Sequence, residues 1–261
     1  MGLFFTGIAS GDATNTSGVF WARTQNSSSD TTGVAAQITL EISETADFKT
    51  LAYTTTTNTA ADNNFAAKID VTILKPGTYY YYRWKGKDGT TDVVSTTGQF
   101  ETVIPASSSE TFRFFHTGDA DGLIDPYLAS QDLARQKFNT GIFNGDVIYE
   151  TASKLSAATP ATKDAAAGTI TQDALLAAYR AKYVEARQPV TPGGFESLDT
   201  LYLAAGQYTT YDNHELGNGQ MINGGAPASL ATKSGKGTND TTLDVNTSGS
   251  FINQTATFKT L

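Results

Sequence analysis

The sequence contains no cysteine and only two histidines, His116 and His214. Without cysteine it can form no disulfide bond, thiolate zinc site or cysteine nucleophile. Imidazole chemistry is likewise limited to two positions. No apolar run reaches the length of a transmembrane helix, so no membrane span is expected. These absences exclude several kinds of catalytic site before any motif is considered.

Positive charge is also scarce, because 18 Lys and Arg residues stand against 26 Asp and Glu residues. The net charge of -8 does not favour a nucleic-acid-binding surface, which needs a basic patch. An acidic balance suits a metal site built from carboxylates, and it suits ordinary solubility equally. Abundant Thr, Ser, Asn and Gly with few Lys favours an extracytoplasmic protein, either periplasmic or secreted. Residues 1–5 do not resemble a signal peptide, so we expect that an export signal was removed or that the protein stays inside the cell.

The chain is long and apolar enough to fold into one large domain or two ordinary ones. It has 261 residues, of which 39% are hydrophobic and 11% aromatic. Residues 19–21, 36–42 and 67–73 show alternating apolar positions or β-forming residues, and turn residues separate them. Several short strands within about 100 residues predict a β-sandwich over residues 3–104.

A turn followed by a run of aromatic residues sharpens this prediction. The string Leu74-Lys75-Pro76-Gly77-Thr78 precedes four consecutive tyrosines, and Tyr80 is the second of them. The pattern resembles the tyrosine corner of fibronectin type III-like sandwiches, in which a Tyr hydroxyl bonds to backbone upstream. It predicts a buried Tyr80 that locks the turn, with Tyr79 and Tyr81 on the opposite face.

The pattern changes after a linker at residues 105–110. From residue 111 onward, predicted strands alternate with predicted helices, which indicates a sheet with crossover helices. The predicted strands cover residues 112–116, 141–144 and 208–211, and the predicted helices cover residues 128–138, 171–187 and 195–205. Residues 152–168 and 217–261 are rich in small residues and are expected to form surface insertions or long loops.

Each of the three predicted strands ends in a polar string. The strings are Gly118-Asp119, Gly145-Asp146 with Tyr149-Glu150 just beyond it, and Asp212-Asn213-His214-Glu215. The carboxyl ends of strands in an open α/β sheet line the ligand crevice. Metal-assisted phosphoester hydrolysis needs oxygen donors, some imidazole and a carboxylate that bridges two ions. The three strings therefore predict such a hydrolase.

Structural explanations of the same residues remain open. Gly-Asp is a common turn pair, so Asp119 and Asp146 could serve only to cap turns. Tyr149 could pack in the core, and Asp212 could orient its turn. Asp121 is a weaker candidate metal ligand, and His116, within an apolar strand, is expected to be a partly buried structural residue.

In combination and in this order, the strings resemble the metallophosphoesterase superfamily, which includes purple acid phosphatases and alkaline phosphatase D. The string Gly145 to Glu150 is similar to the Gly-Asp-x-Ile-Tyr-Glu of the alkaline phosphatase D family. The strings at residues 5–12 and 19–24 resemble the opening of that family's N-terminal sandwich, and residues 178–183 resemble its Tyr-Arg-x-x-Tyr helix. The resemblance extends from residue 3 to about residue 218.

This resemblance implies a fold of mixed α+β or α/β class with two domains. A fibronectin type III-like sandwich at residues 3–104 would precede an α/β metallophosphatase domain at residues 111–261. It also implies hydrolysis of phosphate mono- or diesters by a metal-bound hydroxide at a dinuclear site. The two metal ions would be divalent or trivalent, iron together with calcium, zinc or manganese.

The resemblance further implies a role for each residue of the site. Asp119 and Tyr149 would ligate the first metal, and Asp146 would bridge the two. Asn213 would ligate the second metal or hold the phosphate, while His214 would contact the substrate and protonate the leaving oxygen. Glu150 and Glu215 are expected to support the site or the structure rather than to react.

The sequence departs from the family pattern in three respects. It lacks the cysteine that alkaline phosphatase D proteins place after the first strand, and Asn213 replaces an acidic residue, as in purple acid phosphatases. No histidine follows His214, where the superfamily has a Gly-His-x-His string. We therefore expect the catalytic sheet to be incomplete, with the missing C-terminal part of the same protein as a partner. The alternatives are an inactive surface or filament-associated binding protein that reuses the fold, and an adhesion module based on the sandwich.

Overall fold

The computed structural model describes residues 2–27, 32–120, 127–149, 172–187, 197–210 and 215. The chain forms two compact units. The first comprises residues 1–116, 126–142 and 187–208, and the second comprises residues 117–125, 143–186 and 209–261. Both units draw on segments that are far apart in the sequence. No helix in the described part of the chain is both long and apolar enough to cross a membrane.

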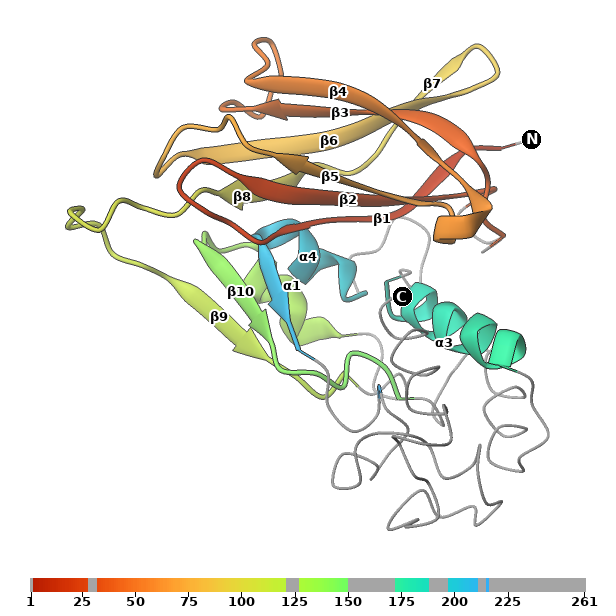
Figure 1. The fold of residues 1–261 in the computed structure, drawn as a ribbon. Coiled ribbons are helices and arrows are strands. Elements are labelled where there is room, and N and C mark those ends of the chain that lie inside the picture. Colours follow the sequence, from red (N-terminus) through yellow and green to blue (C-terminus); the bar gives the residue numbers. More distant parts are fainter. Residues whose placement is uncertain are drawn as a thin grey trace, which may run out of the picture. The chain divides into compact units, whose positions relative to one another are not determined.

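Strands dominate the described residues, and helices are few (Figure 1). The strands are β1 (Phe4–Gly11), β2 (Gly18–Gln25), β3 (Ala36–Ser43), β4 (Tyr53–Thr59), β5 (Ala66–Val71), β6 (Tyr79–Asp88), β7 (Thr91–Val94), β8 (Gly98–Glu101), β9 (Phe114–Thr117), β10 (Thr140–Phe143) and β11 (Gln207–Thr209). The helices are η1 (Ala61–Asn63), α1 (Leu128–Ala134), α3 (Gln172–Arg187) and α4 (Asp199–Ala204). The fold is therefore mostly β-sheet.

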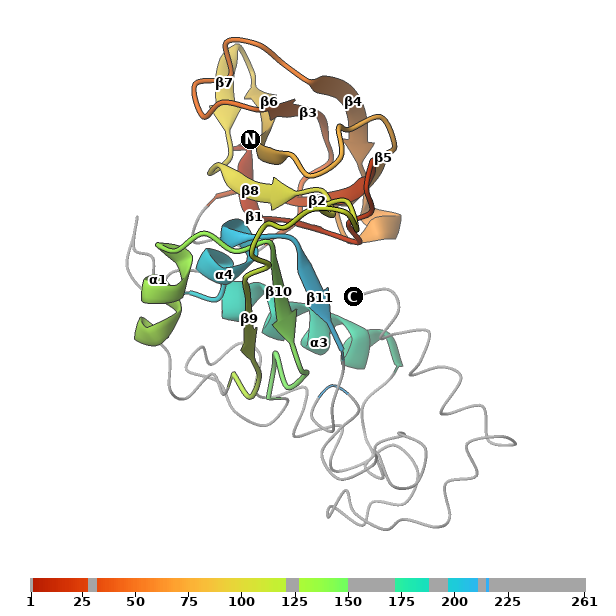
Figure 2. The same cartoon turned by 90° about the vertical axis from the view of Figure 1, so that its left-hand side faces the viewer.

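The strands form two sheets. In one sheet, β3 lies between β4 and β6, and β6 also pairs with β7 and β8, all antiparallel. The other sheet has the strand order β5-β2-β1-β11-β10-β9. Its β1 pairs antiparallel with β2 and parallel with β11 (Figure 2). In the parallel pair, Gly11 lies opposite Gln207. Strands from the first hundred residues and strands from beyond residue 110 thus share one sheet, which the local sequence pattern did not predict.

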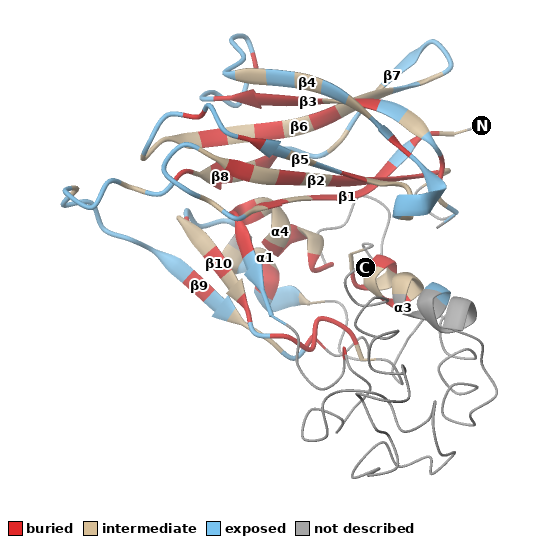
Figure 3. Cartoon of the chain, in the orientation of Figure 1, coloured by how far each residue is buried: buried red, intermediate tan, exposed pale blue. Residues whose placement is uncertain are grey.

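An apolar core joins the antiparallel strands of the two sheets. Phe20 of β2 packs edge-to-face against Tyr82 of β6 and Phe100 of β8, with ring centroids 5.1 and 5.0 Å apart. From Tyr79 to Lys85, half-buried and buried residues of β6 alternate, and the buried Tyr80, Tyr82 and Trp84 belong to this core. Figure 3 shows the alternating buried bands along β6. The two-residue alternation read from the sequence is confirmed here, because successive side chains of a strand face opposite sides.

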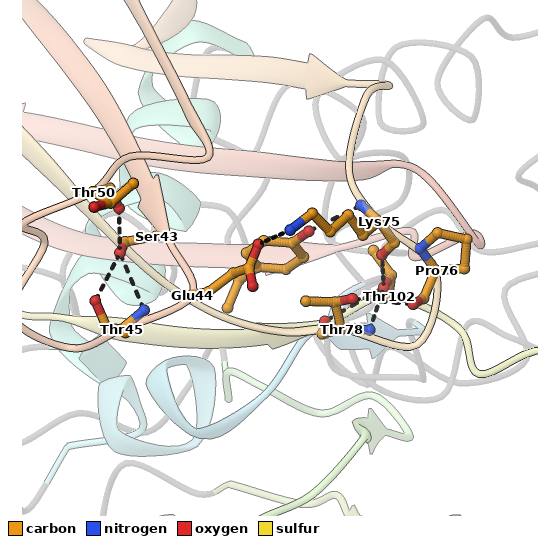
Figure 4. A network of polar contacts seen from close by, with 9 residues as sticks. Ser43, Glu44, Thr45, Thr50, Lys75, Pro76, Thr78 and Thr102 are labelled. Atoms are coloured by element: carbon orange, nitrogen blue, oxygen red, sulfur yellow. Dashed lines mark hydrogen bonds and ion pairs between the residues drawn. The ribbon is translucent and has the colours of Figure 1, made fainter.

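The predicted tyrosine corner is confirmed at Tyr80. Its hydroxyl accepts a hydrogen bond from the backbone N–H of Lys75 at 2.9 Å, and the side chain is 1% exposed. The Thr102 hydroxyl holds the same turn, donating to the Lys75 carbonyl at 2.6 Å and accepting from the Thr78 N–H at 2.9 Å (Figure 4). The Lys75 ammonium pairs with Glu44 at 2.6 Å. The turn before β6 is therefore held by the hydroxyl groups of Tyr80 and Thr102.

Tyr79 and Tyr81 occupy the other face of β6, as predicted. Both are half-buried, and their rings meet edge-to-face at 5.5 Å. The Lys137 ammonium lies 5.0 Å from the Tyr79 ring centroid. Burial raises the pKa of the Tyr79 hydroxyl, with smaller contributions from Tyr81 and Glu101. Tyr79 thus packs against a residue from well beyond the predicted linker.

Helices α1 and α3 begin within one residue of their predicted starts, whereas α4 begins at Asp199 rather than at residue 195, and α1 is shorter than predicted. It ends at Ala134, whereas the sequence pattern extended to residue 138. The apolar residue that suggested the longer helix, Phe138, is buried against Phe115 of β9, with ring centroids 5.1 Å apart. Phe138 is apolar because it packs against β9, not because it lies on α1, and this explains why the predicted helix was too long.

The guanidinium of Arg187 is largely covered by residues of the first compact unit. Arg187 pairs with Asp199 at 2.6 Å and donates to the Ile8 carbonyl at 2.6 Å. Its guanidinium also lies 4.9 Å from the Trp21 ring centroid and 4.3 Å from that of Tyr202. Burial raises the pKa of the Asp199 carboxyl, and Arg187 opposes that rise. A charge held by a carboxylate, a carbonyl and two rings is expected to be costly to disrupt.

Candidate functional site

Two neighbouring strands end in the two Gly-Asp strings. The N–H of Asn139 donates to the Arg113 carbonyl at 2.8 Å, and the N–H of Asn144 donates to the Thr117 carbonyl at 2.8 Å. From the first of these hydrogen bonds to the second, the residue numbers increase on both segments, so β9 and β10 run parallel. Their carboxyl ends, and hence the two strings, lie at the same edge of the sheet.

The two turns that follow bind to each other through their backbones. The Asp119 N–H donates to the Gly145 carbonyl at 3.2 Å, and the Ala120 N–H donates to the Asp146 carbonyl at 2.7 Å. Asp119 and Asp146 have φ values of 57° and 51°, and Gly145 has φ of 89°. Left-handed backbone is uncommon for residues other than glycine, although Asp tolerates it better than most. The turns therefore hold both aspartates in a conformation that local propensity alone would not select.

Asp119 and Tyr149 come together in this arrangement. The Tyr149 hydroxyl donates to Asp119 Oδ1 at 3.3 Å, and Asp119 is exposed while Tyr149 is half-buried. Asp146, in contrast, is 4% exposed. A solvent-facing carboxylate thus meets a phenol, and a buried carboxylate occupies the adjoining turn. Whether these residues bind metal remains a prediction.

Glu215 holds the second turn from 67 or more positions away in the sequence. Its carboxylate accepts hydrogen bonds from the N–H groups of Asp146 at 2.8 Å, Val147 at 2.6 Å and Ile148 at 3.4 Å. Glu215 is itself 4% exposed. Three successive amides around one carboxylate form an anion-binding concavity of the backbone. The sequence predicted only a general supporting role for Glu215, because no local pattern indicates which amides a distant carboxylate will meet.

Several predicted residues lie outside the described part of the chain. They are Asn213 and His214, the weaker metal candidate Asp121, and the neighbouring Glu150 and Asp212. Their roles stay predictions. The remaining histidine, His116, is exposed on β9, so the expectation of a partly buried residue was wrong. On this short last strand of the sheet only Phe115 is buried, and the side chains on either side of it face outward.

The donors that are present suit hard cations. Carboxylate oxygens of Asp119 and Asp146 and the phenol oxygen of Tyr149 are the ligand types that calcium, manganese and ferric iron accept. Among the described residues, however, no group of three or more His, Cys, Asp and Glu side chains converges. A groove near the start of β3 and the end of β6, lined by residues such as Leu3, Lys85 and Lys87, contains none of the predicted site residues. The turns after β9 and β10 are therefore the candidate site.

Comparison with known proteins supports the phosphatase resemblance. Residues 2–104 match the family model described as PhoD-like phosphatase, N-terminal domain. The fold is similar to a solved structure of PhoD, with a TM-score of 0.62, 21% identity, and coverage of 81% of this chain and 39% of that one. The chain thus spans 39% of the length of that structure. The resemblance to PhoD-like alkaline phosphatases predicted from the motifs is confirmed by these two matches.

Other matches are partial. A fibronectin type III domain derived from a human protein matches with a TM-score of 0.28 and 15% identity, covering 41% of this chain and 77% of that one. A sensor domain of an anti-sigma factor from Pseudobacteroides cellulosolvens matches with a TM-score of 0.27 and 19% identity, covering 38% and 94%. The comparison with curated proteins gave no match.

Proposed function

We propose that the chain forms part of a hydrolase of phosphate mono- or diesters, with its site at the turns after β9 and β10. One observation carries the proposal. Asp119 and Asp146 follow neighbouring parallel strands, and the Tyr149 hydroxyl donates to Asp119 at 3.3 Å. Oxygen donors from two turns thus gather at one sheet edge, where ligands of open α/β sheets bind. The similarity to PhoD-like phosphatases supports the same reaction class.

Two metal ions, iron together with calcium, zinc or manganese, fit this set of donors. Asp119 and Tyr149 would hold the first, Asp146 would bridge both, and Asn213 would hold the second or the phosphate. Such ions, when bound, lower the pKa of a water molecule and neutralise charge on phosphoryl oxygens.

Residues of the chain itself would orient the metal-binding carboxylates and protonate the leaving oxygen of the substrate. The hydrogen bond from Tyr149 keeps the Asp119 carboxylate directed toward the phenol. Glu215 holds the backbone of Asp146, and it directly follows His214 in the sequence. His214 would contact the phosphate and donate a proton to the leaving oxygen, which is a common task of histidine.

The proposal includes an arrangement of domains and a partner. A fibronectin type III-like sandwich at residues 3–104 would precede the catalytic domain at residues 111–261 in an extracytoplasmic protein. Phe112 and Phe114 are 51% and 54% exposed beside or on β9, which is the last of the described strands in its sheet. Exposed aromatic residues at a sheet edge favour pairing with further chain. We propose that a C-terminal part of the same protein, which the family resemblance implies, would supply it.

Metal content and hydrolysis test the proposal together. The purified chain is loaded with iron and with zinc, manganese or calcium, its metal is counted by mass spectrometry, and it is assayed on p-nitrophenyl phosphate and bis-p-nitrophenyl phosphate. Because the catalytic sheet is expected to lack its C-terminal part, we expect bound metal and slow hydrolysis of at least one ester. This hydrolysis should be lost after chelation and dialysis and recovered on reloading.

Two variants locate the site. Asp146→Asn should lower kcat/KM by about a hundredfold or more, because a bridging carboxylate would be lost. Asp62→Asn, the same change at an exposed residue of η1, should leave it unchanged. Hydrolysis that survives chelation would refute the mechanism. A folded chain that holds no metal and hydrolyses neither ester would instead favour the binding-protein alternative.

A further inference from the structure

The carboxylate of Glu215 accepts hydrogen bonds from three successive backbone amides. Its Oε2 accepts from Asp146 at 2.8 Å, and its Oε1 accepts from Val147 at 2.6 Å and from Ile148 at 3.4 Å. Glu215 and the backbone that it contacts are buried, since Asp146, Val147 and Ile148 are exposed by 4%, 1% and 2%. Hydrogen bonds to an ionised, buried acceptor are about twice as strong as neutral ones.

These bonds act on the one turn whose conformation matters most to the proposed site. Asp146 has φ of 51° directly after Gly145 at 89°, so two consecutive residues adopt left-handed backbone. A non-glycine residue in that region persists only where its surroundings determine its conformation. The Asp146 carbonyl is engaged by the Ala120 N–H at 2.7 Å, and its N–H is engaged by Glu215. Both peptide groups that flank the Asp146 side chain are therefore fixed.

We propose that Glu215 is a positioning residue for Asp146. Its carboxylate holds the amides of residues 146–148 and thereby sets how well the Asp146 carboxylate binds a cation. The effect on cation binding rests on the proposed function. The hold on the turn does not, because it can be measured without any metal.

The change of Glu215 to Gln separates this role from simple space filling. Gln has almost the same shape, but it replaces one accepting oxygen with an NH₂ group that can only donate. At least one of the three amides must then face another donor. Shortening the side chain in Glu215→Asp keeps the charge but removes one methylene, so the three bonds cannot all keep their lengths. Glu215→Gln loses an acceptor and Glu215→Asp loses length, so both variants should weaken the hydrogen bonds that hold residues 146–148.

Amide hydrogen exchange in the metal-free chain provides the first measurement. We expect the amides of residues 146–148 to exchange at least about tenfold faster in Glu215→Gln than in the wild type. Amides of β6 should be unaffected, and circular dichroism should show a folded chain. Glu110→Gln, the same change at an exposed residue, is the matched control and should alter neither set. Unchanged exchange at residues 146–148 in both Glu215 variants would overturn the hold on the turn.

Cation affinity, measured by calorimetry with Mn²⁺ and with Zn²⁺, is the second measurement. We expect a dissociation constant about tenfold or more weaker in Glu215→Gln, since outer contacts of this kind typically change metal affinity by ten- to a hundredfold. Faster exchange with unchanged affinity would show that Glu215 is merely structural. A wild-type chain that binds neither cation would overturn the proposed function and the cation effect with it, while the exchange result would still decide whether Glu215 holds the turn.

Discussion

In strands β1 to β8 the backbone is held by ladders between neighbouring strands, and alternate side chains fill an apolar core. In the turns after β9 and β10 it is held by bonds between turns and by the carboxylate of Glu215. The first kind of region depends on buried volume, which many apolar residues can supply. The second depends on particular oxygen atoms. Substitutions should therefore affect stability in the first and ligand binding in the second.

The largest effect is expected at the core residue Trp84. Its side chain is completely buried in β6, so Trp84→Ala should lower the free energy of unfolding by about 4 kcal/mol through lost burial and a cavity. Urea denaturation followed by circular dichroism measures the loss. Val94→Ala, on the 47% exposed Val94 of β7, should change it by less than about 0.5 kcal/mol. Similar losses for both variants would contradict the assigned core.

The next effect is expected at Asp199, which tests whether a polar contact can matter as much as apolar packing. Removing its carboxylate in Asp199→Ala leaves the Arg187 charge largely buried without that partner and should cost about 3 kcal/mol. Asp47→Ala disrupts an ion pair whose partner Lys49 is 84% exposed, so it should change the stability far less than Asp199→Ala does. Thermal unfolding of both variants would distinguish them, and equal shifts would argue against a buried pair.

A smaller effect is expected at the tyrosine corner. Tyr80→Phe removes the acceptor of the Lys75 N–H and should cost about 1 to 1.5 kcal/mol. In Tyr208→Phe the lost bond is exposed and 3.3 Å long, so that change should cost less. Chemical denaturation of the two variants under the same conditions measures how much the Tyr80 hydroxyl, apart from its aromatic ring, contributes to the free energy of unfolding.

The stability of the fold should depend on pH through Glu41, the buried carboxylate of β3 that contacts β6. Burial alone would raise the pKa of Glu41, but hydrogen bonds and charges of Arg83 and Lys85 lower it below its ordinary value. A carboxyl with a lower pKa in the folded state stabilises the fold above its unfolded pKa and loses that contribution as the pH falls through the folded value. Glu41→Gln should therefore cost about 1 kcal/mol at pH 7. In denaturation series at falling pH, its difference from the wild type should shrink below about pH 4.5, and a constant difference would contradict this.

The smallest effect, and of opposite sign, is expected at Asp119. Its φ of 57° suits glycine, so Asp119→Gly should raise the free energy of unfolding by about 0.5 kcal/mol while cation binding is lost. Asp62→Gly, the same change within η1, should instead lower it by roughly 0.5 to 1 kcal/mol. Destabilisation by more than about 1 kcal/mol at Asp119 would show that the turn is not strained.

The sequence predicted local features better than long-range ones. Spacing, turn residues and capping can be read directly from a sequence. They predicted the strands near residues 19–21 and 36–42, the corner at Tyr80 and the helix over residues 171–187. The shared sheet of β1 and β11 and the bonds from Glu215 could not be predicted, because both depend on residues brought together only by folding. His116 was misjudged because an apolar strand suggests two covered faces, whereas β9 buries only Phe115.

The parallel pairing of β1 with β11 has a consequence for how the chain folds during synthesis. Gly11 cannot meet Gln207 until nearly the whole described sequence has left the ribosome. Arg187 likewise reaches the Ile8 carbonyl across 179 positions. Until then one side of β1 has no partner, and unpaired strand edges promote aggregation of nascent or shortened chains. Products that stop before β11 should therefore depend on chaperones more than the full sequence does.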